Sequence, residues 1–305
     1  MSITDDIKNA FRQPNNTLKQ LILINVMVFL VFLIIGTPLS WIGYGWVEKL
    51  VVYYLSLPSE PIEFLTKPWT LITYFFTHEG FLHILFNMLN LYWFGMLVTE
   101  YLGTRRLLSL YVLGGIAGGL LYIAMYNLLP GFAEKSANSQ LIGASASVLA
   151  VVVAAATLLP NYTFNLLLIG PVRIKYIAAA IVLLSWYFAR ASSDNAGGNI
   201  AHLGGAFIGW LFVKQLQRGN DMGRPVLAVL DFFANLFKRK PKLKVTHSSF
   251  TGGRAKPNGR SSSSNGPISP DQSEIDRILD KISSSGYESL SKEEKQKLFQ
   301  ASQKD

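Results

Sequence analysis

The chain has 305 residues, of which 50% are hydrophobic and only 15% are charged. A soluble globular protein carries about 25% charged residues, so this composition favours a membrane protein. There is no cysteine, which excludes disulfides, thiolate catalysis and metal sites with cysteine ligands. The formal net charge is +9. Basic residues beside hydrophobic segments are expected of membrane helices, so no nucleic-acid partner is predicted.

Six segments are interpreted as membrane-spanning helices, each of which needs about 20 apolar residues. They cover residues 18–36, 80–98, 107–128, 142–159, 176–189 and 200–213. The last three are rich in Ala and Gly, small residues that let helix backbones approach closely in lipid. Residues 37–77 are broken by prolines and rich in Trp and Tyr, which is typical of a membrane interface.

The remaining sequence predicts how the chain is organised around these helices. We expect a cytosolic N-terminal segment at residues 1–19, an all-α domain of six transmembrane helices at 20–218, and an amphipathic juxtamembrane segment at 219–240. Residues 241–268 are rich in Gly, Ser, Pro and Lys, a composition typical of a disordered linker. Residues 269–305 regain helical patterning, and a capping box of Ser291 and Glu294 predicts a short helical hairpin.

Lysine and arginine in the short loops predict the orientation of the helices in the membrane. One side carries most of them: Lys8, Arg12, Lys19, Arg105, Arg106, Arg173, Lys175, Lys214, Arg218 and Arg224. The opposite side carries only Lys49, Lys67, Lys135 and Arg190. We therefore predict a multi-pass membrane protein with both termini in the cytoplasm, and we expect the plasma (inner) membrane of a bacterium.

Three of the predicted spans carry polar residues near the same end. His83 and Asn87 lie in the span at 80–98, Ser145 in that at 142–159, and His202 in that at 200–213. All three helices are predicted to run from outside to inside, so these side chains are expected at one depth near the outer face. Ionisable groups within spans are costly and usually functional, so this convergence indicates a site.

The residue types suit nucleophilic catalysis. Serine and histidine are the minimum for acyl transfer, because imidazole takes the hydroxyl proton and later returns it to the leaving group. The tetrahedral intermediate needs hydrogen-bond donors for its oxyanion. Asn87 and His83 are four residues apart on one helical face, and the Ser145 N–H is free in the first turn of its helix. No Asp or Glu lies within the predicted spans, which argues against a carboxylate proton relay.

Each of these residues also has a plain structural interpretation. A serine in an Ala- and Gly-rich span is usually a packing residue, and an interfacial histidine such as His78 is more often a loop residue than a catalyst. A histidine within a span, such as His202, is more often functional. Residues 145 and 147 point about 200° apart around a helix. Ser147 falls in a stripe of small residues and is predicted to pack, whereas Ser145 lies off the stripe, about one turn from the outer end.

Three motifs occur in order on these helices. They are HxxxN at His83–Asn87, GxS at Gly143–Ser145 and GxxxAHxxG at Gly197–Gly205. Together they resemble the rhomboid family of intramembrane serine proteases, and the resemblance covers roughly residues 20–218. It departs from the family at Trp69-Thr70, where the family has Trp-Arg, and at Ala146, where glycine often follows the serine.

The resemblance implies a catalytic dyad with Ser145 as nucleophile and His202 as general base. His83, Asn87 and the Ser145 amide would form the oxyanion hole. Close helix packing around the site is implied at Gly143, Gly197, Ala201 and Gly205. The family's substrates are single-span membrane proteins cut within the lipid bilayer near its outer face, and no cofactor or metal is implied. A cytosolic partner for the C-terminal hairpin is a further expectation.

Two other functions stay open at this point. One is a catalytically inactive rhomboid-like protein that binds membrane clients, although such proteins typically lack the serine or the histidine that are present here. The other is a small membrane transporter that uses the polar cluster as a substrate site. Transporters often contain internal repeats, and the two halves of this chain show no convincing one.

Overall fold

The computed structural model describes residues 3–12, 16–133, 139–166, 169–236 and 272–302. The chain divides into two compact units, Met1–Lys240 and Pro241–Asp305, and each is described by itself. The predicted linker at 241–268 lies outside the described residues.

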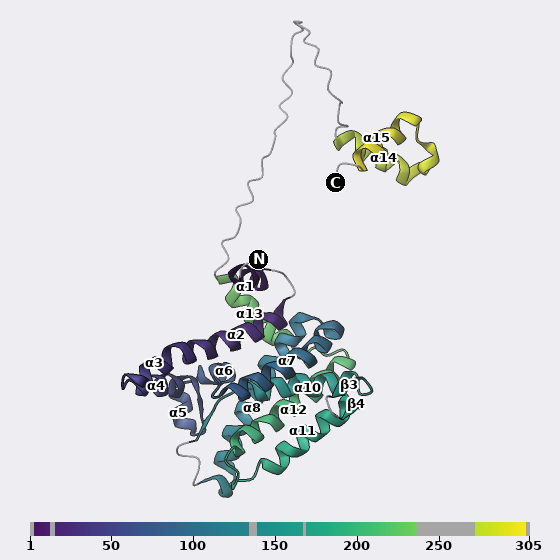
Figure 1. The fold of residues 1–305 in the computed structure, drawn as a ribbon. Coiled ribbons are helices and arrows are strands. Elements are labelled where there is room, and N and C mark those ends of the chain that lie inside the picture. The colour runs from purple at the N-terminus through teal and green to yellow at the C-terminus, as the bar shows by residue number, and fades with distance from the viewer. Residues whose placement is uncertain (1–2, 13–15, 134–138, 167–168, 237–271, 303–305) are drawn as a thin grey trace. The chain divides into compact units, whose positions relative to one another are not determined.

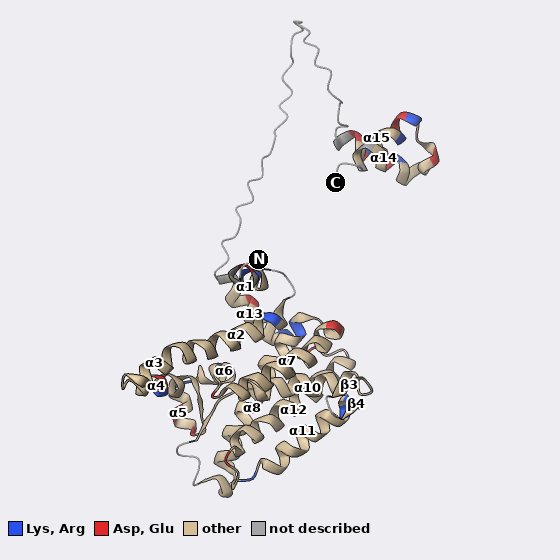
Figure 2. Cartoon of the chain, viewed as in Figure 1, with Lys and Arg blue, Asp and Glu red and all other residues tan. Residues whose placement is uncertain are grey.

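The first unit is built almost entirely from helices (Figure 1). Among the described residues, four helical segments are long and apolar enough to cross a membrane. They are Thr17–Trp41 (α2 at Thr17–Val31, η1 at Phe32–Gly36 and α3 at Thr37–Trp41 in succession), α7 at Phe81–Leu102, α8 at Thr104–Leu128 and α12 at Ala196–Gln217. Two shorter apolar helices are α10 at Ser145–Leu158 and α11 at Ile174–Phe188. Charged residues gather near the ends of these helices (Figure 2). The long apolar helices therefore make this chain an integral membrane protein.

A helix lies at each of the six predicted segments, and within the described residues four of these are long and apolar enough to cross a membrane. The difference from the prediction that matters most is at the start of α10. The segment at 142–159 was expected to be helical throughout, with Ser145 about one turn from its end. That prediction is wrong, because α10 begins at Ser145 itself. Gly143 has a φ of 110°, which a right-handed helix cannot contain and which favours glycine. Ser145 therefore lies at the helix N-terminus, directly after a sharp turn.

The region at 37–77 folds into short helices: α3 at Thr37–Trp41, α4 at Gly45–Leu55, α5 at Pro61–Thr66, α6 at Thr70–Thr73 and η2 at Tyr74–Phe76. Trp69 Nε1–H donates to the carbonyl oxygen of Tyr54 at 2.9 Å, and the Thr70 hydroxyl donates to that of Lys67 at 2.6 Å. These bonds hold the Trp69-Thr70 turn in place without the arginine that rhomboids have there.

Two small antiparallel sheets were not predicted. Strand β1 at Leu57–Pro58 pairs with β2 at Gln140–Leu141, which ties the region of short helices to the segment leading into α10. Strands β3 at Thr163–Leu166 and β4 at Gly170–Arg173 form a hairpin between α10 and α11. Strands this short carry too few residues to show an alternating hydrophobic pattern, so the sequence gives no signal for them.

Helices α8, α10 and α12 pack closely at the centre of the unit. A Cβ atom added at Gly205 of α12 would overlap the carbonyl oxygen of Ala146, and one at Gly209 would overlap that of Ala150. A Cβ at Gly118 of α8 would lie 2.6 Å from the Cβ of Ala146. Because backbone touches backbone here, the position of α12 relative to the start of α10 is tightly fixed.

The first unit also has a helix near each of its own ends. They are α1 at Ile3–Arg12, which was not predicted as a helix, and α13 at Arg224–Leu236, within the segment predicted to be amphipathic. The Arg106 side chain binds Asp221 at 3.0 Å, and Arg105 binds Asp231. These ion pairs connect the start of α8 with the segment that carries α13.

The second unit contains α14 at Gln272–Ser285, the short helix η4 at Tyr287–Ser289 and α15 at Lys292–Ser302. The two residues of the predicted capping box bind each other's backbone. Glu294 N–H donates to Ser291 Oγ at 3.2 Å, and Ser291 N–H donates to the Glu294 carboxylate at 2.7 Å. Ile278 and Leu290 are buried and supply the small apolar core of this unit.

Candidate active site

A cavity of about 620 Å³ brings together the four polar residues that the sequence singled out. His83 and Asn87 from α7, Ser145 from α10 and His202 from α12 all line it. The loop before α10 and the start of α12 complete its wall. Side chains that lie far apart in the sequence therefore share one concave, partly polar site, which is the usual form of a ligand-binding or active site.

The site lies where helix N-termini meet. His83 is in the first turn of α7, Ser145 is the first residue of α10, and His202 is in the second turn of α12. Asn195 caps α12, because its Oδ1 accepts a hydrogen bond from Gly198 N–H at 3.2 Å. Backbone N–H groups in a first helical turn have no partner within the helix, and the helix dipole favours negative charge there. The cavity is therefore suited to an anionic intermediate next to Ser145.

The turn before Ser145 is held from two sides. Gly143 N–H donates to the carbonyl oxygen of Tyr74 at 2.9 Å, and Ala144 N–H donates to His78 Nε2 at 3.3 Å. A Cβ atom on Gly143 would lie 2.7 Å from His83 Cε1, so only glycine fits beside this ring. The His83 ring and the serine-bearing turn consequently pack directly on each other.

His78, which sequence reasoning treated as a loop residue, is one of these supports. It is buried, and its ring meets that of His83 edge to face with the centroids 5.2 Å apart. Burial, assisted by the neighbouring His83, lowers the pKa of His78 to about 4. The ring is therefore neutral at physiological pH and can accept the Ala144 hydrogen bond. The only sequence signal was its position five residues before His83, directly ahead of a span.

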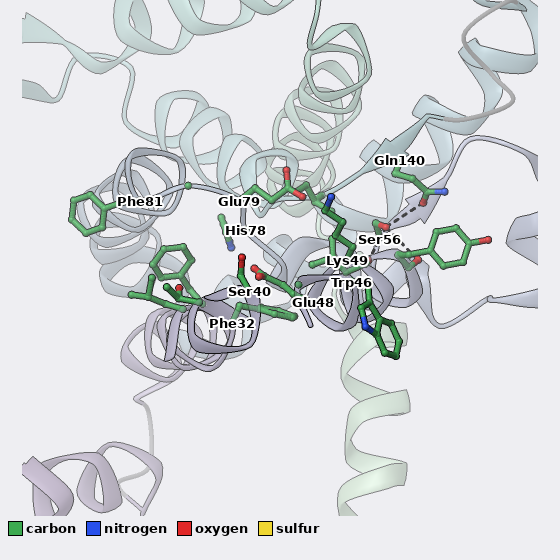
Figure 3. Close-up of a pocket in the computed structure, with 18 residues that line it drawn as sticks. Phe32, Ser40, Trp46, Glu48, Lys49, Ser56, His78, Glu79, Phe81 and Gln140 are labelled. Atoms are coloured by element: carbon green, nitrogen blue, oxygen red, sulfur yellow. Dashed lines mark hydrogen bonds between the residues drawn. The ribbon is translucent and has the colours of Figure 1, made fainter. Parts of the chain in front are cut away.

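On its other side, His78 lines a second cavity. This cavity has a volume of about 940 Å³ and lies between the region of short helices and the start of α7, with Ser40, Glu48 and Glu79 also in its wall (Figure 3). His83, Ser145 and the other predicted site residues do not line it.

Asn87 presents an unused donor to the first cavity. Its side chain is only 7% exposed, and among the described residues its Nδ2 atom has no hydrogen-bond partner. A buried donor without a partner costs free energy, so such a group commonly binds a ligand or an intermediate. Asn90, the other amide of α7, differs because its Nδ2 donates to the carbonyl oxygen of Phe86 at 2.8 Å and it does not line the cavity.

The Nδ1 atom of His202 is hydrogen-bonded to a residue that the sequence did not single out. This atom lies 3.0 Å from the hydroxyl of Ser185 on α11. This leaves Nε2 as the ring nitrogen available to Ser145. Within the described residues no hydrogen bond joins Ser145 Oγ to His202. Such bonds are often long in a site without substrate and shorten in the reacting complex.

Ser147 lies away from the site. Its side chain is fully buried, its Oγ has no partner among the described residues, and it is absent from the cavity wall. A Cβ atom on Gly115 of α8 would lie 2.6 Å from this oxygen, so Ser147 packs against α8. The two serines thus face different surroundings, as their helical spacing predicts.

The arrangement places a hydroxyl, two imidazoles and hydrogen-bond donors in one cavity, and these are the types of group that acyl transfer requires. Across the part of the chain that the structure describes, no cluster of three His, Asp or Glu side chains is placed to hold a metal ion.

Comparison with known proteins agrees with the motifs. The Rhomboid domain matches residues 65–218, about half of the chain, and a family of unknown function (DUF6576) matches residues 269–304. "Rhomboid protein 1, mitochondrial" of Saccharomyces cerevisiae is 28% identical over 216 residues, which are 69% of this chain and 56% of that protein. "Rhomboid protease GluP" of Bacillus subtilis is 30% identical over 165 residues, 53% of this chain and 29% of that protein.

A further relative is "RHOMBOID-like protein 12, mitochondrial" of Arabidopsis thaliana, 27% identical over 158 residues, or 49% of this chain and 47% of that protein. The chain spans about half to two thirds of the length of such curated relatives. Their names include mitochondrial, chloroplastic and bacterial proteins, so they do not support the expected bacterial plasma membrane over an organelle membrane. The matched domain does establish the family: this integral membrane protein belongs to the rhomboid family.

Proposed function

We propose that this chain is an intramembrane serine endopeptidase that cleaves single-span membrane proteins. The observation that carries the proposal is the shared cavity, which Ser145, His202 and Asn87 line together, with Asn87 Nδ2 lacking a partner among the residues described. Family membership and the relative named as a protease add to it. Both members of the dyad are present, which distinguishes this chain from rhomboid-like proteins that lack one of them.

The reaction begins when Ser145 Oγ attacks the carbonyl carbon of the scissile peptide bond. His202 Nε2 takes the hydroxyl proton as the new C–O bond forms, and the carbonyl oxygen becomes an oxyanion. Asn87 Nδ2, His83 and the Ser145 N–H donate hydrogen bonds to that oxygen. The helix N-terminus of α10 adds a favourable electrostatic field at the same point.

The intermediate then collapses. The C–N bond breaks, and His202 gives its proton to the leaving amine, so that an acyl ester remains on Ser145. A water molecule that loses a proton to His202 attacks the ester in the second half of the reaction. The second tetrahedral intermediate releases the new carboxyl terminus and regenerates the Ser145 hydroxyl, with the proton returned from His202.

The proposal includes a topology. α10 and α11 also cross the membrane, which gives six spans and puts both termini on the side rich in lysine and arginine. The site then lies near the opposite face, where the N-terminal ends of α7, α10 and α12 meet. At about 1.5 Å per residue a helix of the length of α10 is shorter than a typical hydrocarbon core, so a cavity at its end is reached more easily by water.

Co-expression with a panel of tagged single-span membrane proteins tests the proposal. We expect at least one protein to be cleaved by the wild type and left intact by both Ser145→Ala and His202→Ala. Cleavage that persists in Ser145→Ala would show that another protease acts and would contradict the proposal. Solute uptake into proteoliposomes that survives both substitutions would instead favour a transporter.

A further inference from the structure

The side chain hydrogen-bonded to His202 Nδ1 is a serine that is buried on an apolar helix, α11. Ser185 is only 3% exposed, and its Oγ lies 3.0 Å from His202 Nδ1. Most of the side chains around it on α11 are large and apolar, and Leu183, Leu184 and Trp186 are exposed on the outer surface of the helix. Ser185 is thus the one polar side chain that α11 buries, and it is directed at the proposed general base.

The buried residues of α11 lie on one face of the helix, and Ser185 is one of them. The helix buries Ile174, Ala178 and Ser185, which recur at helical spacing and form the face in contact with the rest of the unit. α11 packs mainly on α12, the helix that carries His202. Ile174 and Ala178 are buried on this face without a polar side-chain atom, so burial there does not by itself call for a hydroxyl.

The chemistry of a general base requires a partner at this ring nitrogen. For Nε2 to accept the proton of Ser145, the neutral imidazole must carry its own proton on Nδ1. That N–H needs an acceptor, and the Ser185 oxygen can accept it. Neither acidic residue in the cavity wall, Glu79 or Asp194, is bonded to His202. Once His202 has taken the proton from Ser145, the Nδ1–H donor belongs to a cation and its hydrogen bond to Ser185 becomes stronger.

We propose that Ser185 is a positioning residue for the reaction. It holds the His202 ring with Nδ1 toward α11 and Nε2 toward Ser145, and it accepts the Nδ1–H bond of the imidazolium. This rests on the proposed function, in which His202 is the general base. Because the bond is stronger when His202 is charged, Ser185 acts on the chemical step more than on substrate binding.

The experiment compares wild type, Ser185→Ala and Ser185→Thr in proteoliposomes. It measures the rate at which a fluorophosphonate probe labels Ser145, and kcat and KM for a single-span protein that the wild type cleaves. Ser147→Ala is the matched control, since it removes a buried hydroxyl that does not contact His202. Melting temperatures show whether each variant is folded.

We expect Ser185→Ala to lower both kcat and the labelling rate about tenfold, with KM changed less than about twofold. Ser185→Thr, which keeps the hydroxyl, should stay within about threefold of wild type, as should Ser147→Ala. The inference is overturned if Ser185→Ala matches wild type, or if Ser185→Thr is as slow as Ser185→Ala, because a lost hydroxyl would then not be the cause. If the wild type itself shows no Ser145-dependent labelling or cleavage, the proposed function fails and the inference falls with it, which is a distinct result.

Discussion

At the scale of single residues, the site depends on how the polar atoms around Ser145 are paired. Ala144 N–H is hydrogen-bonded to His78 Nε2 and His202 Nδ1 to Ser185 Oγ, whereas Asn87 Nδ2 has no partner in the part of the chain that the structure describes. The turn before Ser145 and the His202 ring are thus each held by a hydrogen bond, while the proposed oxyanion donor Asn87 Nδ2 has no partner among these described residues. Pre-organised donors of this kind stabilise developing charge without having to reorient during the reaction.

His78 predicts a pH dependence of stability. Its pKa is lowered from 6.5 to about 4 in the folded chain, so the unfolded chain binds more protons between these values. Its contribution to stability is complete above about pH 6.5 and is lost as the pH falls toward 4, by an amount on the order of 3 kcal/mol. Thermal unfolding in detergent should show this loss for the wild type and a flatter profile for His78→Gln. Equal slopes for the two proteins would refute the role of this histidine.

The same residues show what could be predicted from the sequence and what could not. His83, Asn87, Ser145 and His202 were predicted as one site from their common depth, and they do line one cavity. Ser185 gave no signal, because a lone serine in an apolar helix is usually a packing residue and its contact with His202 depends on how two helices pack. The burial of His78 could not be predicted from the sequence either, because it results from the fold of the residues around it.

At the scale of elements, hydropathy predicted the helices well and their ends poorly. The apolar composition of a span is spread over many residues, whereas its end depends on a few. The start of α10 depends on the positive φ of Gly143, which helical periodicity does not reveal. The β1–β2 pair depends on partners about 80 residues apart, and nothing local predicts it.

Close packing of α12 on α10 gives a prediction at this scale. Gly205→Ala places a Cβ against the carbonyl oxygen of Ala146, next to Ser145, so the two helices must separate. We expect a loss of about 1–3 kcal/mol in the free energy of unfolding and a clear fall in Ser145-dependent cleavage. Gly131→Ala is the matched control, because a Cβ there meets open space. If both variants melt and cleave like the wild type, the helices do not touch as described.

At the scale of the whole molecule, the chain combines a membrane unit, which carries the site, with a second compact unit. All the described residues that line the cavity with Ser145 belong to Met1–Lys240. The second unit has its own small core and capping box, and it coincides with the match to a family of unknown function. The expected cytosolic partner of this unit stays a prediction.

Truncation after Lys240 tests whether the first unit is sufficient. We expect the truncated chain to cleave a tagged single-span protein within about twofold of the full chain, since none of its cavity-lining residues is removed. Cleavage assays on equal amounts of purified protein in proteoliposomes give the comparison, with truncated Ser145→Ala as the blank. A loss of more than about tenfold, in a truncated chain that still melts cooperatively, would show that residues 241–305 take part in the reaction.

The central claim is that Ser145 is a nucleophile activated by His202. It is tested most directly by reacting the solubilised wild-type protein with a fluorophosphonate probe and locating the modified residue by mass spectrometry. We predict a single adduct on Ser145, none on Ser147, no labelling of Ser145→Ala, and labelling of His202→Ala reduced by at least about a hundredfold. Labelling that persists at the same rate in Ser145→Ala, or a folded wild-type protein that is not labelled at all, would contradict the claim.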